Sequence, residues 1–205
     1  MDADRRVLFV GESFVAGVGD PTGLGWVGRV VEASFAAGLP LTAYNLGVRT
    51  ETSLDVEARL PGEARPRMRA PQAGYGVVLG VGVNDTTEED GRVRVAPGLA
   101  ADALGRMLEV AARLGARGFV VGPAPSGDLA QDDRVRALSA AFAPVAARHG
   151  APFVEVVDAL CAQRAWTAEA AAGDGVHPGA GGYAALARLV LAAGWLEWLA
   201  TLAPA

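Results

Sequence analysis

The sequence predicts an α/β fold in which helices cover both faces of a parallel β-sheet. One observation is that short apolar segments alternate along the chain with longer segments whose apolar residues recur at helical spacing. Another is that the short segments are apolar without interruption, as in strands buried on both faces, rather than alternating between apolar and polar residues. Together these patterns indicate a doubly wound domain.

Five segments have the length and composition of buried strands. Glycine directly follows the first four of them, which is typical of a strand that ends in a turn. The predicted strands cover residues 7–10, 41–46, 76–81, 118–121 and 152–157.

The segments between these strands carry apolar residues on one helical face. The clearest is residues 99–114, after which Gly115 acts as a stop signal. Asp132 and Asp133 mark the entry of a later helix, because negative charge is favourable at a helix N-terminus, and Pro144 is expected to kink or shorten that helix. The predicted helices cover residues 26–37, 51–60, 99–114, 132–145 and 183–199.

The composition suits one compact domain over residues 1–205, because 51% of the residues are hydrophobic. The net charge of −5 comes without a basic block, which argues against a nucleic-acid partner. The single cysteine, Cys161, excludes an intrachain disulfide. The N-terminus has no signal-peptide pattern and no apolar stretch is long enough for a membrane span, so we expect a cytoplasmic protein without a membrane partner.

Neither a metal nor a cofactor is expected from the sequence. The two histidines and the one cysteine lie far apart, and no ligand cluster has a recognised spacing. No glycine-rich nucleotide-binding motif follows the first predicted strand. His149 precedes Gly150 at the end of a predicted helix, where an imidazole is a favourable neighbour of the helix dipole, and we interpret it as structural.

Polar residues follow the predicted strands, at the edge of the sheet where this class of fold binds ligands. Ser13 follows the first strand and Gly47 the second, Asn84 follows the third, and Asp174 and His177 precede the last helix. Each residue alone has an ordinary structural interpretation, since serine, glycine and asparagine are common in turns. A hydroxyl, backbone N–H groups, an amide, a carboxylate and an imidazole at one edge are the set that acyl transfer to serine requires.

Each of these residues has a chemical role in that reaction. A serine hydroxyl is a weak nucleophile, so Ser13 needs a base, and the imidazole of His177 is suited to it. Asp174 lies three positions before His177 and is placed to orient it. The N–H groups of Ser13 and Gly47 and the amide of Asn84 are candidate donors to the oxyanion of a tetrahedral intermediate.

At these positions the chain resembles the SGNH hydrolases, the GDSL esterase/lipase family. Four sequence blocks carry the resemblance in family order: "GESF", "NLG", "GVND" and "DGVHP". The resemblance implies a flavodoxin-like three-layer α/β/α sandwich with a five-stranded parallel sheet in the order 2-1-3-4-5. It also implies a catalytic Ser13, His177 and Asp174, an oxyanion hole of Ser13, Gly47 and Asn84, and hydrolysis of a small-molecule ester without a cofactor.

The chain departs from the family pattern at a few positions near the site. Glu12 replaces the usual aspartate of the first block, Phe14 its usual leucine, and Thr50 a frequent glycine. We predict substrate contacts for Glu12, Asp85 and Trp166, and the segment 86–98, "TTEEDGRVRVAPG", is a candidate wall or lid of the site.

Two alternatives stay open at this stage. The same site could deacetylate sugars or cleave a thioester, because the loops that select a substrate vary. The fold could also serve a ligand-binding module without catalysis. Labelling of Ser13 by a fluorophosphonate probe separates an enzyme from such a module. The natural substrate and the oligomeric state are left open by the sequence.

Overall fold

A computed structural model of the protein describes residues 4–202, and its main β-sheet has five parallel strands. Their spatial order is β2-β1-β3-β6-β7. Counted within this sheet alone, that is the order 2-1-3-4-5, so the prediction is confirmed. The strands are β1 (Arg5–Gly11), β2 (Thr42–Gly47), β3 (Gly74–Gly80), β6 (Ala116–Val121) and β7 (Phe153–Val154).

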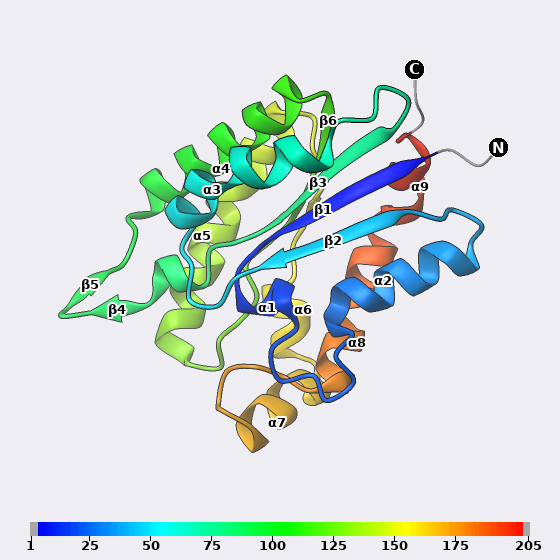
Figure 1. The fold of residues 1–205 in the computed structure, drawn as a ribbon. Coiled ribbons are helices and arrows are strands. Elements are labelled where there is room, and N and C mark those ends of the chain that lie inside the picture. The colour runs from blue at the N-terminus through cyan, green and yellow to red at the C-terminus, as the bar shows by residue number, and fades with distance from the viewer. Residues whose placement is uncertain (1–3, 203–205) are drawn as a thin grey trace.

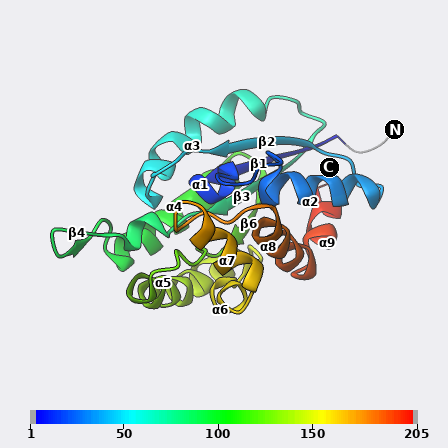
Figure 2. The same cartoon turned by 90° about the horizontal axis from the view of Figure 1, so that it is seen from below.

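Helices cover both faces of the sheet (Figures 1 and 2). One face carries α3 (Ser53–Arg67), α4 (Pro97–Arg113) and α5 (Leu129–Arg148). The other carries α2 (Gly25–Ala36), α8 (Ala180–Ala192) and α9 (Trp195–Ala200). Short helices complete the connections: α1 (Ser13–Ala16), a 3-10 turn at Asn84–Thr86, α6 (Val157–Cys161) and α7 (Arg164–Ala172).

The central strand β1 shows why the predicted strands are apolar without interruption. Val7 and Phe9 point to the core under α2, α8 and α9, whereas Leu8 and Val10 point to the core under α3, α4 and α5. All four side chains are fully buried. Because successive residues of a strand face opposite sides, a sheet with two covered faces needs an apolar residue at every position.

Several predicted element boundaries are wrong. Pro144 lies inside α5, which continues to Arg148 because Phe142 and Val145 pack into the core on either side of it. The predicted last helix is split into α8 and α9 by Gly194, whose φ is +87°. The last strand has only the two residues of β7. Core packing and one glycine therefore outweigh the local propensities.

The segment predicted as a wall or lid contains a small antiparallel hairpin of β4 (Glu88–Glu89) and β5 (Arg92–Val93). It projects from the carboxyl-end side of the sheet (Figure 1). Among residues 4–202, the helices are too short or too polar to traverse a lipid bilayer.

Candidate active site

The first part of the site is a sharp turn at the end of β1. Gly11 pairs with Gly47 of β2 on one side and with Gly80 of β3 on the other. A Cβ at Gly11 would lie 2.0 Å from the carbonyl oxygen of Gly80, so only glycine fits between the backbones at the end of this strand. Ser13 follows at the start of α1 and is 6% exposed.

Ser13, His177 and Asp174 form a continuous hydrogen-bonded chain. Ser13 Oγ lies 2.7 Å from His177 Nε2, although 164 positions separate the two residues. On the other side of the ring, His177 Nδ1 lies 2.6 Å from Asp174 Oδ2. Because a carboxylate accepts, Nδ1 carries the hydrogen and the lone pair of Nε2 faces the serine hydroxyl. The structure thus brings together the nucleophile, base and orienting carboxylate that the sequence predicts.

Local hydrogen bonds build the loop that carries Asp174 and His177. Asp174 Oδ1 accepts from the N–H of His177 at 2.8 Å and from that of Val176 at 3.0 Å. These backbone donors, together with the imidazole, hold the pKa of Asp174 well below its ordinary value. The ring of Phe14 lies 5.1 Å from the His177 ring, centroid to centroid, and packs against it. The carboxylate therefore stays ionised and the imidazole keeps one orientation.

Glu12 lies beneath Ser13, inside the protein. Its side chain is 2% exposed, and Oε2 accepts from Phe14 N at 2.9 Å and faces Ser13 Oγ at 3.2 Å. Burial raises the pKa of Glu12 to about 7. The carboxylate caps α1 inside the protein, and the substrate contact of Glu12 stays a prediction.

Asn84 and Asp85 are neighbours with different surroundings. Asn84 Nδ2 donates to the carbonyl oxygen of Glu51 at 2.9 Å, which uses one of its two amide hydrogens. Asp85 is fully buried and accepts from the N–H and the hydroxyl of Ser53 at the start of α3. Burial raises the pKa of Asp85. Asp85 therefore fixes α3 to the turn of Asn84, and its contact with substrate stays a prediction.

Gly47 packs closely against α1, and its N–H has a partner within the protein. Its N–H is bonded to Asn45 Oδ1 at 3.1 Å. A Cβ at Gly47 would lie 2.2 Å from Ala16 N, so the glycine is needed for the close packing of β2 against α1. The role of Gly47 as an oxyanion donor stays a prediction.

Trp166 lies one layer behind the site. It is 2% exposed, its Nε1 donates to Pro125 O at 3.3 Å, and its ring is 5.4 Å from that of Phe14. It also lines a cavity of about 130 Å³ together with Cys161, Thr167 and Gly175. Trp166 therefore supports Phe14, which in turn supports His177, and its substrate contact stays a prediction.

Two arginines at the site were not predicted from the sequence. Arg59 of α3 donates to Leu46 O at 2.7 Å and to Gly11 O at 3.0 Å, and its Nε lies 2.6 Å from Glu51 Oε2. Arg94 donates to Thr50 O at 3.0 Å. An arginine that binds backbone carbonyls leaves no pattern in the sequence. The one sequence feature that could have drawn attention to Arg94 is its partner Thr50, which stands where the family often has glycine.

Within residues 4–202, no three histidine, cysteine, aspartate or glutamate side chains are grouped as metal ligands. The described site is thus an arrangement of hydroxyl, imidazole, carboxylate and amide groups.

Fold and site together define a class of protein: a three-layer α/β/α domain with a hydrogen-bonded serine–histidine–aspartate chain at the carboxyl ends of its strands. The chain belongs to the GDSL-like lipase/acylhydrolase family, whose model matches residues 9–185. It is accordingly a hydrolase of the esterase type, as predicted from the sequence blocks. Comparison with curated protein sequences gives no match.

Solved structures share the fold at low sequence identity. TesA is 24% identical, with a TM-score of 0.75 over 92% of this chain and 97% of TesA. A lipase/acylhydrolase from Enterococcus faecalis is 22% identical, with a TM-score of 0.75 over 98% of each chain. A catalytic mutant of Axe2, an acetylxylan esterase from Geobacillus stearothermophilus, is 19% identical, with a TM-score of 0.74 over 94% of this chain and 95% of that one.

Proposed function

We propose that the protein is a serine esterase that hydrolyses carboxylic esters through an acyl-enzyme on Ser13. The observation that carries this proposal is the unbroken chain from Ser13 Oγ to His177 at 2.7 Å and from His177 to Asp174 at 2.6 Å. Distances in this range allow direct proton transfer between neighbouring groups. The reaction needs water as its only co-substrate.

In the acylation step, Ser13 Oγ attacks the ester carbonyl carbon while its proton passes to His177 Nε2. The carbonyl oxygen becomes an oxyanion, and Asp174 stabilises the imidazolium that forms. When the tetrahedral intermediate collapses, the bond to the leaving alcohol oxygen breaks and His177 returns the proton to that oxygen. The products are a free alcohol and an acyl ester on Ser13.

In the deacylation step, a water molecule attacks the acyl carbon and transfers a proton to His177. The second tetrahedral intermediate collapses by breaking the bond to Ser13 Oγ, which recovers its proton from the imidazolium. The products are a carboxylic acid and the free enzyme. Glu12 competes only weakly for the serine hydrogen, because its Oε2 lies 3.2 Å from Oγ whereas His177 Nε2 lies at 2.7 Å.

Two groups are proposed as donors to the oxyanion. One is the backbone N–H of Ser13 at the start of α1. The other is the amide of Asn84, whose remaining hydrogen is left over after its bond to Glu51 O. Such donors lower the barrier because they strengthen as negative charge develops on the oxygen.

The test is a comparison of the parent with Ser13→Ala on p-nitrophenyl esters of increasing acyl length, on an acyl thioester and on an acetylated xylooligosaccharide. We expect hydrolysis of at least one ester by the parent and no turnover above background by Ser13→Ala. A fluorophosphonate probe should label the parent and leave the variant unlabelled. Turnover by a folded Ser13→Ala variant would exclude the acyl-enzyme, and a parent that neither turns over nor labels would indicate a ligand-binding module.

A further inference from the structure

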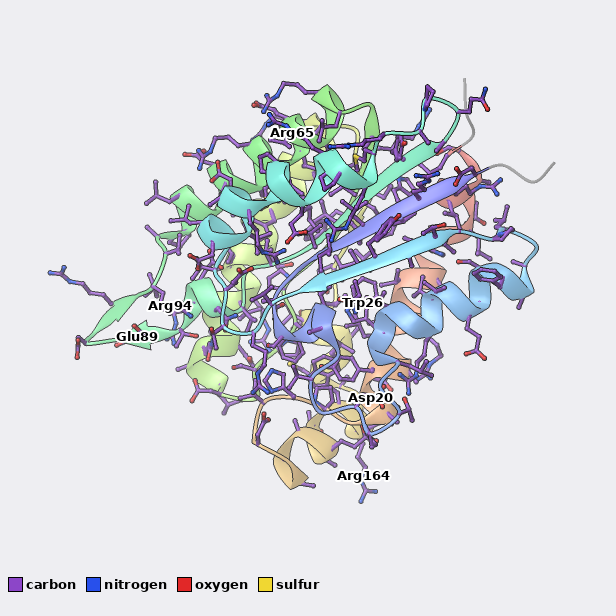
Figure 3. The ribbon with its side chains drawn as sticks, viewed as in Figure 1. Asp20, Trp26, Arg65, Glu89, Arg94 and Arg164 are labelled. Carbon is purple, nitrogen blue, oxygen red and sulfur yellow. The ribbon has the colours of Figure 1, made fainter. Side chains whose placement is uncertain are left out.

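The β4–β5 hairpin takes no part in the proposed chemistry, yet it makes a specific contact with the site. Arg94 follows β5 directly and donates from Nη1 to the carbonyl oxygen of Thr50 at 3.0 Å. Its Nε lies 3.5 Å from Glu89 Oε1 on the other strand of the hairpin (Figure 3). The guanidinium of Arg94 thus connects the hairpin to the segment that follows β2.

The segment that Arg94 contacts has an unfavourable backbone conformation. Thr50 has a φ of +66° and is one of two residues other than glycine with a positive φ in the described part of the chain. A β-branched residue is strained there, so the surrounding contacts must hold it in place. Thr50 Oγ1 donates to Arg49 O, which leaves Arg94 as the group that holds the carbonyl of Thr50.

The peptide after Thr50 contacts the proposed oxyanion donor. The carbonyl oxygen of Glu51 accepts from Asn84 Nδ2 at 2.9 Å. Because Thr50 and Glu51 are consecutive, a rotation of the Thr50 backbone would also displace the carbonyl of Glu51. The orientation of the Asn84 amide therefore depends on the conformation of Thr50.

We infer that Arg94 is a positioning residue for Asn84, which it holds indirectly by fixing the Thr50–Glu51 turn. The inference rests on the proposed function, in which Asn84 donates to the oxyanion. A catalytic group that is misplaced by about 1 Å lowers the rate by up to ~10²-fold. The hairpin thus supplies the arginine that stabilises the positive φ of Thr50.

Arg59 also contacts Glu51, but it is a less informative position for mutation. It lies 18% exposed and donates to the carbonyl oxygens at the ends of β1 and β2 as well as pairing with the Glu51 carboxylate. Its removal would disturb the ends of two core strands. Arg94 contacts the turn through one hydrogen bond, so its removal tests the turn alone.

The first test measures kcat, KM and Tm of Arg94→Met and Arg94→Lys on a p-nitrophenyl ester. Arg94→Met should lower kcat by roughly 10- to 100-fold with KM changed by less than about 3-fold. Arg94→Lys should recover most of the loss, because an ammonium group can still donate to Thr50 O. The matched control is Arg113→Met, which removes an exposed arginine paired with Glu109 at 3.5 Å within α4 and should leave kcat unchanged.

The second test asks through which residues Arg94 acts. In a Thr50→Gly background, where glycine adopts a positive φ without strain, Arg94→Met should lower kcat by less than about 3-fold. In an Asn84→Ala background the same change should again have little effect, because the group that Arg94 positions is already absent. A role in stability alone would lower Tm equally in all backgrounds and leave kcat of the folded protein unchanged.

Three outcomes would overturn the inference: normal kcat in Arg94→Met, an equal fold-loss in every background, or a change confined to KM. If Arg94→Met does not fold, Arg94→Lys and the Thr50→Gly double variant provide the same readouts. Ser13→Ala, measured in parallel, separates a failure of the role of Arg94 from a failure of the proposed function. An inactive Ser13→Ala beside a fully active Arg94→Met would overturn only the role of Arg94, whereas an active Ser13→Ala would overturn the proposed function and this inference with it.

Discussion

Two carboxylates flank the Ser13–His177 pair, and they lie in opposite environments. Asp174 is half-exposed in a loop, where two backbone N–H groups and the imidazole donate to it, and its pKa is lowered. Glu12 is buried at the end of β1, and burial raises its pKa to about 7 although Phe14 N donates to it. Hydrogen-bond donors therefore dominate at Asp174, and loss of hydration dominates at Glu12.

The different environments of the two carboxylates suit them to different roles. In the proposed mechanism Asp174 orients His177 and must stay ionised, and its loop provides the donors and the solvent for that. Glu12, beneath Ser13, shapes a turn by accepting from Phe14 N at the start of α1. Mutation of each residue should accordingly act on a different quantity.

The largest effect is expected when the charge of Asp174 is removed. Asp174→Asn keeps the shape of the side chain but no longer favours the tautomer in which His177 Nε2 accepts from Ser13. By analogy with serine hydrolases of other folds, kcat should fall by about 10⁴-fold. Steady-state kinetics beside circular dichroism measure the loss in a folded protein. A loss below about tenfold would remove Asp174 from the proposed role.

Asn84, which neither carboxylate contacts, should show the next largest effect. Asn84→Ala removes a donor that strengthens as the oxyanion forms, so kcat should fall by ~10²–10³-fold with little change in KM. If Asn84 only stabilises its turn, the variant should instead lose about 1 kcal/mol of stability and keep a kcat within a few-fold of the parent. Thermal unfolding measured beside kinetics distinguishes these results.

The buried carboxylate should make stability fall as the pH rises. The pKa of Glu12 is raised from 4.5 to about 7, so the folded state binds more protons than the unfolded state between these values. The contribution is fully present below pH 4.5 and is lost as the pH rises through about 7. At ~1.36 kcal/mol for each pH unit, the loss amounts to about 3 kcal/mol.

Glu12→Gln lacks this titration and provides the comparison. Urea unfolding of both proteins from pH 4 to pH 8 should show the parent losing free energy of unfolding relative to the variant, by about 3 kcal/mol across the range. A constant difference between the two proteins would mean that Glu12 keeps an ordinary acidity in the fold.

The smallest effect is the opposite pH dependence at Asp174. Its pKa is lowered from 3.8, so its contribution to stability is present above that value and is lost as the pH falls below it. Relative to Asp174→Asn, the parent should lose stability only in acid, and modestly, because the side chain is 49% exposed. Acid titration of both proteins, followed by circular dichroism, measures it. A parent that gains stability over the variant in acid would contradict the shift.

Much of the fold could be predicted because the pattern of apolar residues in the sequence indicates which segments are buried. Every residue of β1 from Val7 to Val10 is apolar since both faces of the sheet are covered, and the strand order then follows from the family resemblance. The β4–β5 hairpin could not be predicted, because its strands have two residues each and no apolar periodicity. The prediction that Pro144 shortens its helix was wrong because the local sequence does not show how the neighbouring residues pack into the core.

The proposed catalytic residues could also be chosen from the sequence, since few groups perform acyl transfer and strand ends locate them. Their supporting residues could not. Arg94 reaches Thr50 across 44 positions and Arg59 reaches Gly11 across 48, in both cases through a backbone carbonyl that any residue would provide. The burial of Glu12 could not be predicted for a related reason: a charged residue after a strand suggests solvent exposure, but the N–H of Phe14 at the start of α1 donates to its carboxylate inside the protein.

The separation of Ser13 and His177 by 164 positions has a consequence for biosynthesis. During translation Ser13 is synthesised long before His177. In the proposed mechanism, a nascent chain that ends before the loop of Asp174 and His177 carries a serine without its base and has no esterase activity. Hydrolysis would then begin only after that late segment has docked beside α1, so the first turnover would report that the early and late parts of the chain have come together.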